Sequence, residues 1–269
     1  MVTLDQAGAG AASVRLVPPS PALQERVQHL WVETPEAAGA QGLAAWRIVA
    51  DHCGHLLYHR LRGPDGVVAH RLVLVGSRTT AVDSDKRGRL ATAGVRLQPW
   101  SLPALFGASA AELADRAVAL TDILGSSAAA LADQLEAAAP EELPTVLERW
   151  LSPLAAATKS QAEQHACYAA RLLAGATACG EAASKLGISS RRLRSLMHEQ
   201  VGLAPKAFAR IVRLHRVLER ARAAGGVACW SRIAAANAFT DQAHLIREFR
   251  DLLGETPGVW ARRASTLQM

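Results

Sequence analysis

The feature that most constrains this chain is a pattern that occurs twice in its last hundred residues. In each copy a short run of small residues is followed by a break and then by apolar side chains at helical spacing, over 181–199 and again over 231–252. This pattern predicts two short helices joined by a tight turn, the helix-turn-helix arrangement. The repetition about fifty residues later makes that interpretation much stronger than either copy alone.

In the first copy, Gly187 is placed to end the first helix in the left-handed conformation, and Ser189 is a good N-cap for the second. The second helix would turn Leu193, Leu196 and Met197 inward and its arginines outward. Arginine can donate two hydrogen bonds to guanine in the major groove of DNA. Taken alone, this copy leaves open a plain solvated face on an ordinary helix.

In the second copy, 231–236 predicts the first helix and 237–239 the turn. Thr240 or Asp241 can cap the second helix, whose buried side would be formed by apolar residues. Between the copies, Pro205 is placed to begin a helix over 205–223 with one apolar and one arginine-rich face. Nineteen residues make a rod of about 28 Å. Because successive major-groove segments lie roughly 34 Å apart, the rod could place two reading helices on one side of a duplex.

The charge distribution separates the chain into two parts. From residue 160 onward there are 16 Lys and Arg against 8 Asp and Glu, whereas 1–159 hold 14 against 16. A basic half joined to a near-neutral half suggests a polyanion-binding module attached to a part of different function. No run of 18 apolar residues and no signal-peptide pattern is present, so we expect a soluble, cytoplasmic protein without membrane contact.

The first half predicts an α+β domain. Residues 1–13 read as a flexible tail, 14–155 as one domain, and 160–264 as an all-α domain. Turn residues separate short β-type runs at 14–17, 46–49, 55–58, 71–75 and 93–97, whereas 23–32 could be a short helix or a strand entry. Further on, 109–117, 123–139 and 141–154 read as helices, the first with a Ser109–Glu112 capping box.

Residues 165–263 also resemble the AraC/XylS-type transcriptional regulators. The resemblance rests on AASKLGISSRRLRSLM, VGLAPKAF, RLHRVL, IAAANAFTDQAHLIREFR and the closing LGETPGVWARR. The family's usual Gly before Phe239 is Ala238 here, and its common aromatic at position 245 is Leu. Ala238 could strain a turn that needs a positive φ, although the neighbouring Asn237 tolerates that conformation.

The resemblance implies a sequence-specific DNA-binding protein that reads base edges with both second helices. The predicted DNA-binding residues are Ser189, Ser190, Arg191, Arg192, Arg194, Ser195, Asp241, Gln242, Ala243, His244 and Arg247. Among them the resemblance assigns base contacts to Arg191, Arg194 and Ser195 in the first unit. In the second unit it assigns them to Gln242, Ala243, His244 and Arg247.

The first half resembles a cupin-like sensor module found fused to such regulators, through PPSPALQERVQHLWV, VADHCGHLL and the run from Gly94 to Leu120. The resemblance implies a small β-barrel that binds a small-molecule effector, followed by helices that mediate homodimerisation, with RNA polymerase as a further candidate partner. The candidate effector-binding residues are Trp46, His52, His55, Tyr58, Arg96 and Trp100. Plain core packing is the competing interpretation for each aromatic residue.

Five potential metal ligands lie within nine residues, and on a strand Cys53, His55 and His59 would share one face. Gly54 suggests a turn there, so we expect no metal and no cofactor. No catalytic motif stands out, so the sequence predicts a regulator and not an enzyme. The alternative is a metal-dependent cupin-like enzyme carrying a vestigial DNA-binding tail.

Overall fold

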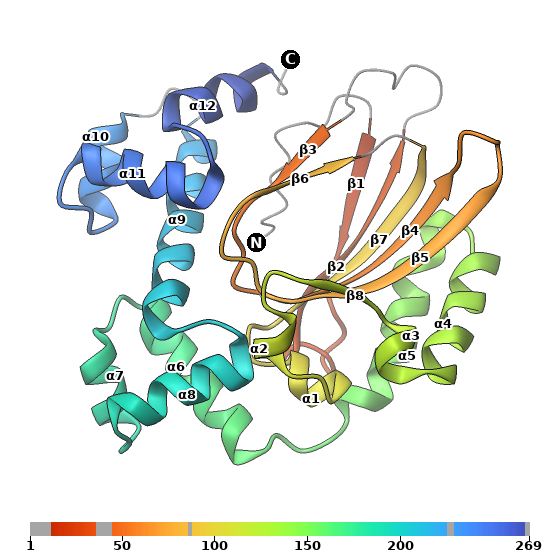
Figure 1. Cartoon of the computed structure of the whole chain (residues 1–269), viewed down its shortest axis with the longest axis horizontal. Helices are drawn as coiled ribbons and strands as arrows, with labels where there is room; N and C mark the ends of the chain where they lie inside the picture. Colours follow the sequence, from red (N-terminus) through yellow and green to blue (C-terminus); the bar gives the residue numbers. More distant parts are fainter. Residues whose placement is uncertain (1–11, 36–44, 86–87, 225–228, 267–269) are drawn as a thin grey trace.

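The computed structural model describes residues 12–35, 45–85, 88–224 and 229–266. Its first half combines a curved antiparallel sheet with helices, and its second half is a group of helices on the other side of the molecule (Figure 1). The predicted tail lies outside the described residues except for Ala12 and Ser13, which begin the first strand.

The strands form two antiparallel sheets. The larger has the order β1-β2-β7-β4-β5-β8 and the smaller pairs β3 with β6. The strands are β1 (Ala12–Val17), β2 (Val27–Pro35), β3 (Ala45–Ile48), β4 (His55–Arg62), β5 (Val68–Val75), β6 (Val82–Asp85), β7 (Arg89–Leu97) and β8 (Ala117–Ala119). The predicted small barrel therefore takes the form of a curved six-stranded sheet accompanied by a two-stranded one (Figure 1).

Each of the five β-type runs seen in the sequence overlaps a strand, but three strands differ from expectation. For residues 23–32 the sequence allowed either a short helix or a strand entry. In the structure this segment is a turn followed by β2, which pairs with both β1 and β7. The short β6 and β8 carry little periodic signal, and β8 overlaps the end of the helix predicted over 109–117. These two strands form because partners β3 and β5 satisfy their backbone groups.

Helices cover one side of the large sheet. They are α1 (Leu102–Phe106), α2 (Ala110–Leu113), α3 (Thr121–Leu124), α4 (Ser126–Ala137) and α5 (Leu143–Ala155). The predicted Ser109 cap is confirmed, since its side chain accepts from the backbone N–H of Glu112 at 3.3 Å. Leu56 and Val95 from the sheet pack with Leu131 and Leu147 from the helices in one continuous core.

The second half contains helices and no strand within its described residues, as the sequence predicts. The helices are α6 (Gln161–Ala174), α7 (Cys179–Lys185), α8 (Ser190–Val201), α9 (Pro205–Ala223), α10 (Trp230–Ala236), α11 (Gln242–Leu253) and α12 (Pro257–Thr266). Helix α9 has the predicted bounds and 19 residues, and runs between α7–α8 at one end and α10–α11 at the other (Figure 1). Phe208, Leu214, Phe249 and Trp260 lie in the core that unites them.

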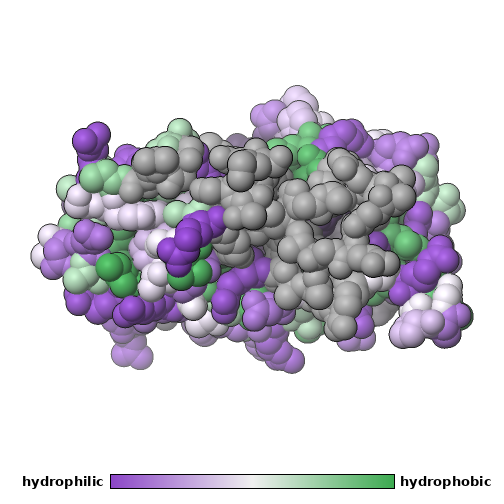
Figure 2. All heavy atoms as spheres, turned by 90° about the horizontal axis from the view of Figure 1, so that it is seen from above, coloured by the Kyte–Doolittle hydropathy of each residue, from purple (hydrophilic) through white to green (hydrophobic). Residues whose placement is uncertain are grey.

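The two halves share an apolar boundary. Val49, Ala50 and Trp100 of the first half belong to the core of the second. At the lower edge α2 packs against α8, where Gly202 is so close that an added Cβ would lie 2.4 Å from the carbonyl oxygen of Ala110. Seen from above, the coloured surface is mostly hydrophilic, with apolar residues in small separate groups (Figure 2). This buried boundary makes the halves one packed body.

Candidate DNA-binding surface and interdomain cavity

The first helix-turn-helix unit consists of α7, a turn at 186–189 and α8. Gly187 adopts φ +66° and donates its N–H to Ser184, while the N–H of Ile188 reaches the carbonyl of Ala183. The Ser189 side chain accepts from the backbone N–H of Arg192 at 3.1 Å, so the predicted N-cap is confirmed. These local bonds end α7 and begin α8 within a few residues.

Helix α8 separates its apolar and cationic sides as expected. Leu193, Leu196 and Met197 are buried in the C-terminal core. The predicted DNA-binding residues Ser189, Ser190, Arg191, Arg192 and Arg194 are exposed, and Ser195 is half-buried. The first turns of α8 therefore present a cationic surface to solvent, of the kind that enters a major groove.

The second unit consists of α10, a turn at 237–241 and α11. Asp241 caps α11 by accepting from the N–H of His244 at 2.6 Å. Gln242, Ala243 and Arg247 are exposed. His244 is half-buried, and its ring packs edge-on against Phe239. Its Nε2 lies 3.8 Å from the Glu248 Oε1. This predicted base-contacting side chain is therefore engaged by other residues of the second unit.

The turn of the second unit carries the strain that the sequence suggested. Ala238 has φ +56°, whereas Asn237 has φ −121° and does not take over the left-handed position. Asn237 instead donates its side-chain amide to the carbonyl of Ile233 at 2.8 Å. The Arg213 guanidinium lies 4.5 Å from the centroid of the Phe239 ring and covers the strained turn. The left-handed residue is thus Ala238 itself, and the side chain of Arg213 from α9 packs against this turn.

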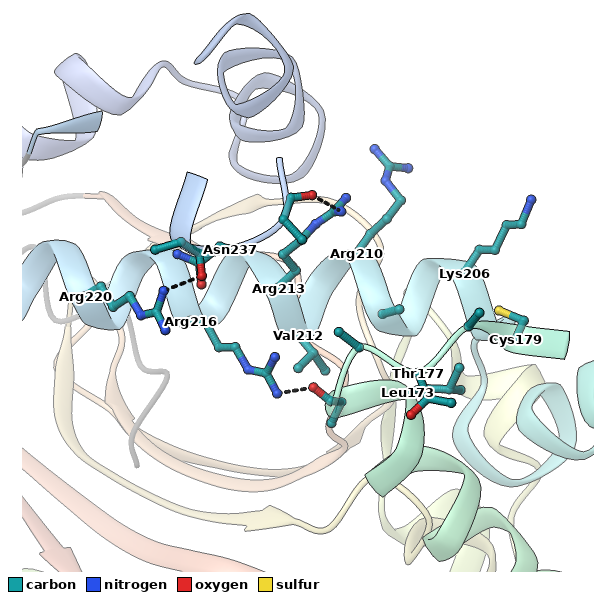
Figure 3. A pocket seen from close by; sticks show the side chains of 16 residues that line it. Leu173, Thr177, Cys179, Lys206, Arg210, Val212, Arg213, Arg216, Arg220 and Asn237 are labelled. Atoms are coloured by element: carbon teal, nitrogen blue, oxygen red, sulfur yellow. Dashed lines mark hydrogen bonds between the residues drawn. The ribbon is translucent and has the colours of Figure 1, made fainter. Parts of the chain in front are cut away.

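The arginine face of α9 holds the two units in place. Arg216 donates to the carbonyl oxygen of Ala174, beside the first unit, and Arg220 donates to that of Ala236, in the second, at 2.7 Å (Figure 3). Arg210 binds the Glu248 carboxylate at 2.9 Å through Nε. These side chains line a cavity of about 550 Å³ between the units. The arginine-rich face of α9 could be seen in the sequence. That its side chains bind carbonyl oxygens of the neighbouring helices could be seen only in the structure, because those carbonyl groups lie far away in the sequence.

A second cavity, of about 480 Å³, lies between the two halves of the molecule. Its lining residues are Gln28, His52, Arg96 and Gln98 from the first half and Val212, His215, Arg216 and Glu219 from α9. Most of these side chains are polar or charged, so the cavity suits a polar occupant.

Beside this cavity, Asp51 is buried and held by three groups. Both Nη atoms of Arg96 donate to its carboxylate, with Nη2 2.6 Å from Oδ1, and the His55 Nε2 lies 2.9 Å from Oδ2. The backbone N–H of Cys53 donates to Oδ1 at 3.1 Å. Burial opposes ionisation of Asp51, but Arg96 beside it keeps its pKa well below the ordinary value.

Two histidines face each other across the boundary. The rings of His52 and His215 have centroids 5.1 Å apart, and the His215 Nε2 lies 2.7 Å from the backbone oxygen of Ala50. Burial lowers the pKa of His215 to about 4 and lowers that of His52 well below its ordinary value. Both imidazoles are therefore neutral near pH 7.

The predicted effector-binding residues are only partly brought together. His52 and Arg96 line the interdomain cavity, and His55 supports Asp51 behind it. Tyr58 lies in the core of the first half with its hydroxyl 2.5 Å from the His70 Nδ1, and Trp100 lies in the boundary core. The backbone of Trp46 pairs with Ser84, but its side chain falls outside the described residues.

The ligand set considered from the sequence is not the one that the fold assembles. Cys53 is buried and accepts from the Gln28 amide at 3.3 Å, and the His59 Nδ1 lies 3.1 Å from the Thr92 hydroxyl. Within the described part of the chain, the group able to share one ion is Asp51, His52 and His215. His215 could not be foreseen because it lies 163 residues beyond His52.

Two family models match the chain. Residues 182–263 match a helix-turn-helix domain, and residues 15–119 match a domain of unknown function, DUF6597. None of the curated proteins matches. Among the helices that the structure describes, none has the length and apolar character needed to cross a membrane.

Several solved structures are similar over most of the chain. ToxT from Vibrio cholerae O395 is 10% identical with a TM-score of 0.41, covering 82% of this chain and 97% of that one. A second crystal form of ToxT from Vibrio cholerae is 8% identical with a TM-score of 0.42, covering 94% and 98%. Wild-type ToxT of strain SCE256, bound to an unsaturated fatty acid, is 10% identical with a TM-score of 0.40, covering 81% and 93%.

The matched helix-turn-helix model and the two capped, arginine-bearing units define a DNA-binding domain. Its two units, joined by α9, have the arrangement that the resemblance to AraC/XylS-type regulators implies. The match over residues 182–263 accordingly confirms the DNA-binding module that the sequence predicts.

Proposed function

We propose that this protein is an AraC-type transcriptional regulator that binds a specific DNA sequence, and that a small polar effector, held in the cavity between its halves, controls that binding. The observation that carries the proposal is that the two halves of the molecule each contribute residues to the walls of this cavity. One wall comes from the first half, and the other comes from α9, the helix that carries both helix-turn-helix units. An occupant that binds one arrangement of these walls better than another shifts the population of DNA-binding conformations.

On the DNA side, α8 is the principal reading helix and α11 the secondary one. Arg191 and Arg194 are exposed at the start of α8, where guanidinium groups can reach guanine edges and phosphates. On α11 the corresponding surface has Arg247 as its exposed cation among the predicted reading residues, because His244 packs on Phe239. We therefore expect stronger sequence preference in the half of the site that α8 contacts.

The test is selection of bound sequences from a random DNA library by the full-length protein, followed by affinity measurement on the enriched site. Each of Arg191→Ala and Arg194→Ala should weaken that affinity by about 1–3 kcal/mol, or roughly 5- to 150-fold. The matched control is Arg62→Ala with Arg71→Ala, which removes two exposed arginines from the sheet half. Unchanged affinity in the variant that combines Arg191→Ala with Arg194→Ala would show that α8 does not read the site.

The effector is tested separately from DNA. A screen of small polar molecules should yield compounds that raise the melting temperature of the wild-type protein, because ligands of the folded state stabilise it. Gln98→Trp, which fills the interdomain cavity from its rim, should abolish the shift while leaving the unliganded melting temperature nearly unchanged. Stabilisation that persists in this variant would place the effector elsewhere.

A homodimer and RNA polymerase are the further partners that the resemblance implies. For the dimer, we expect sedimentation of the full-length protein to give twice the monomer mass at micromolar concentration. A monomer at all concentrations, with intact DNA binding, would contradict this part of the proposal.

A further inference from the structure

The histidine pair at the boundary has the form of an incomplete metal-binding site. One ligand atom from each of Asp51, His52 and His215 lies within 4.8 Å of the other two, with Asp51 and His52 in the first half and His215 on α9. The His52 Nδ1 is 3.6 Å from the Asp51 Oδ1. Two ligands of a tetrahedral ion, each about 2.0–2.2 Å from it, are separated by roughly 3.4 Å.

The hydrogen-bond pattern leaves ligand nitrogens unused. A carbonyl oxygen can only accept, so His215 must carry its proton on Nε2, where it donates to Ala50 at 2.7 Å. In the neutral ring, Nδ1 then holds a lone pair. That Nδ1 is buried without a hydrogen-bond partner, and so is the Nδ1 of His52. An imidazole that donates one ring N–H to a backbone carbonyl is the usual arrangement of a metal-bound histidine.

Asp51 resembles a metal ligand held by an outer shell, because Arg96 and His55 orient its carboxylate. Its Oδ1 already accepts from Arg96 and from the N–H of Cys53, so a metal ion would replace one of these contacts. The positive charge of Arg96 weakens binding of hard cations, which need several carboxylates. Imidazole nitrogens favour zinc, cobalt, nickel and copper instead.

We propose that Asp51, His52 and His215 bind one divalent transition-metal ion, of the zinc class, across the boundary between the two halves. The ion would tie the segment before β4 to the middle of α9. Glu219, one helical turn beyond His215, lines the same cavity and is available to the remaining coordination position. Any effect of the ion on DNA affinity rests on the proposed function, whereas metal binding itself does not.

The experiment uses the full-length protein carrying Cys229→Ser, which removes an exposed thiol that would compete for the metal. Titration with Co²⁺ should produce the visible absorption of a tetrahedral ion and saturate at one ion per chain. Excess Zn²⁺ should abolish this signal, whereas excess Mg²⁺ should leave it unchanged. Absence of a saturable cobalt spectrum would overturn the proposal.

Two glutamine variants locate the site. His215→Gln keeps a side-chain N–H near Ala50 but removes Nδ1, and His52→Gln removes the opposing ligand; each should weaken cobalt affinity by more than about tenfold. His198→Gln, an exposed histidine on α8, is the matched control and should bind cobalt like the parent. If His215→Gln fails to fold, His52→Gln alone decides. Parent-like affinity in a folded His52→Gln variant would refute the assignment, without bearing on whether the protein selects a DNA site.

Discussion

His215 and Ala50 join the two halves of the molecule through a hydrogen bond of 2.7 Å between imidazole Nε2 and a backbone carbonyl. The N–H of the same Ala50 donates to the carbonyl of Leu252 at 3.3 Å. One peptide segment of the first half therefore contacts both the rod between the helix-turn-helix units and the end of the second reading helix. A shift of the segment around Ala50 would therefore change contacts on both α9 and α11.

A second link, between Arg26 and Glu163, makes the contribution of this boundary to stability measurable. Their side chains are 4% and 1% exposed and form two bonds of 2.8 and 2.9 Å. Glu163→Gln leaves a buried guanidinium without its counter-charge, so we expect a loss of about 3–5 kcal/mol in the free energy of unfolding. Urea denaturation measures it. Glu25→Gln, which breaks a surface pair with Lys159, should have no measurable effect. Equal losses in the two variants would contradict this.

The strained turn of the second unit predicts a stabilising substitution. Ala238 adopts φ +56°, a conformation that costs an alanine about 1–2 kcal/mol and glycine almost nothing. Because glycine also loses more entropy on folding, we expect Ala238→Gly to gain up to about 1 kcal/mol. The control Ala235→Gly lies inside α10 at an exposed position and should lose about 0.5–1 kcal/mol. Thermal unfolding distinguishes the two; destabilisation by Ala238→Gly would disprove the strain.

The arginine clamps on α9 predict an effect on the spacing of DNA subsites. Arg216 and Arg220 bind carbonyl oxygens beside opposite units, so removing both should let the two reading helices move relative to each other. In gel-shift assays, Arg216→Ala with Arg220→Ala should weaken binding to the selected site. The same variant should bind sites with one base pair added or removed between the subsites better, relative to the selected site, than the wild-type protein does. A uniform loss at all spacings would mean that these arginines act as phosphate contacts.

His59 predicts part of the acid sensitivity of the first half. Burial, together with Arg89 and Arg71, lowers the pKa of His59 to about 4, whereas in the unfolded chain it is near 6.5. Between pH 6.5 and pH 4, His59 is protonated in the unfolded chain but stays neutral in the folded protein. Stability is therefore lost as the pH falls from about 6.5 to about 4, at up to roughly 1.4 kcal/mol per pH unit.

His59→Gln should reduce this slope, whatever its effect on stability at neutral pH. The comparison is made by urea denaturation at several pH values between 7 and 4. Parallel curves for the variant and the wild-type protein would show that His59 does not titrate as its burial requires.

Local pattern was sufficient for the DNA-binding half. Gly187, Ser189, Pro205 and Asp241 act on backbone groups within a few residues of themselves, so the positions of α8, α9 and α11 follow from short-range hydrogen bonding and helical period. The helix-turn-helix interpretation followed from the same repeated unit.

The functional groups between the halves depended on long-range packing. His52 meets His215 across 163 residues of sequence, and Arg216 meets Ala174 only because α6 packs against α9. Trp100, a candidate for an effector pocket, is instead part of the boundary core. Sequence by itself determined the double helix-turn-helix because its signals are local. Tertiary structure decided the cavity, the arginine clamps and the histidine pair, because their partners come from segments that no periodic pattern connects.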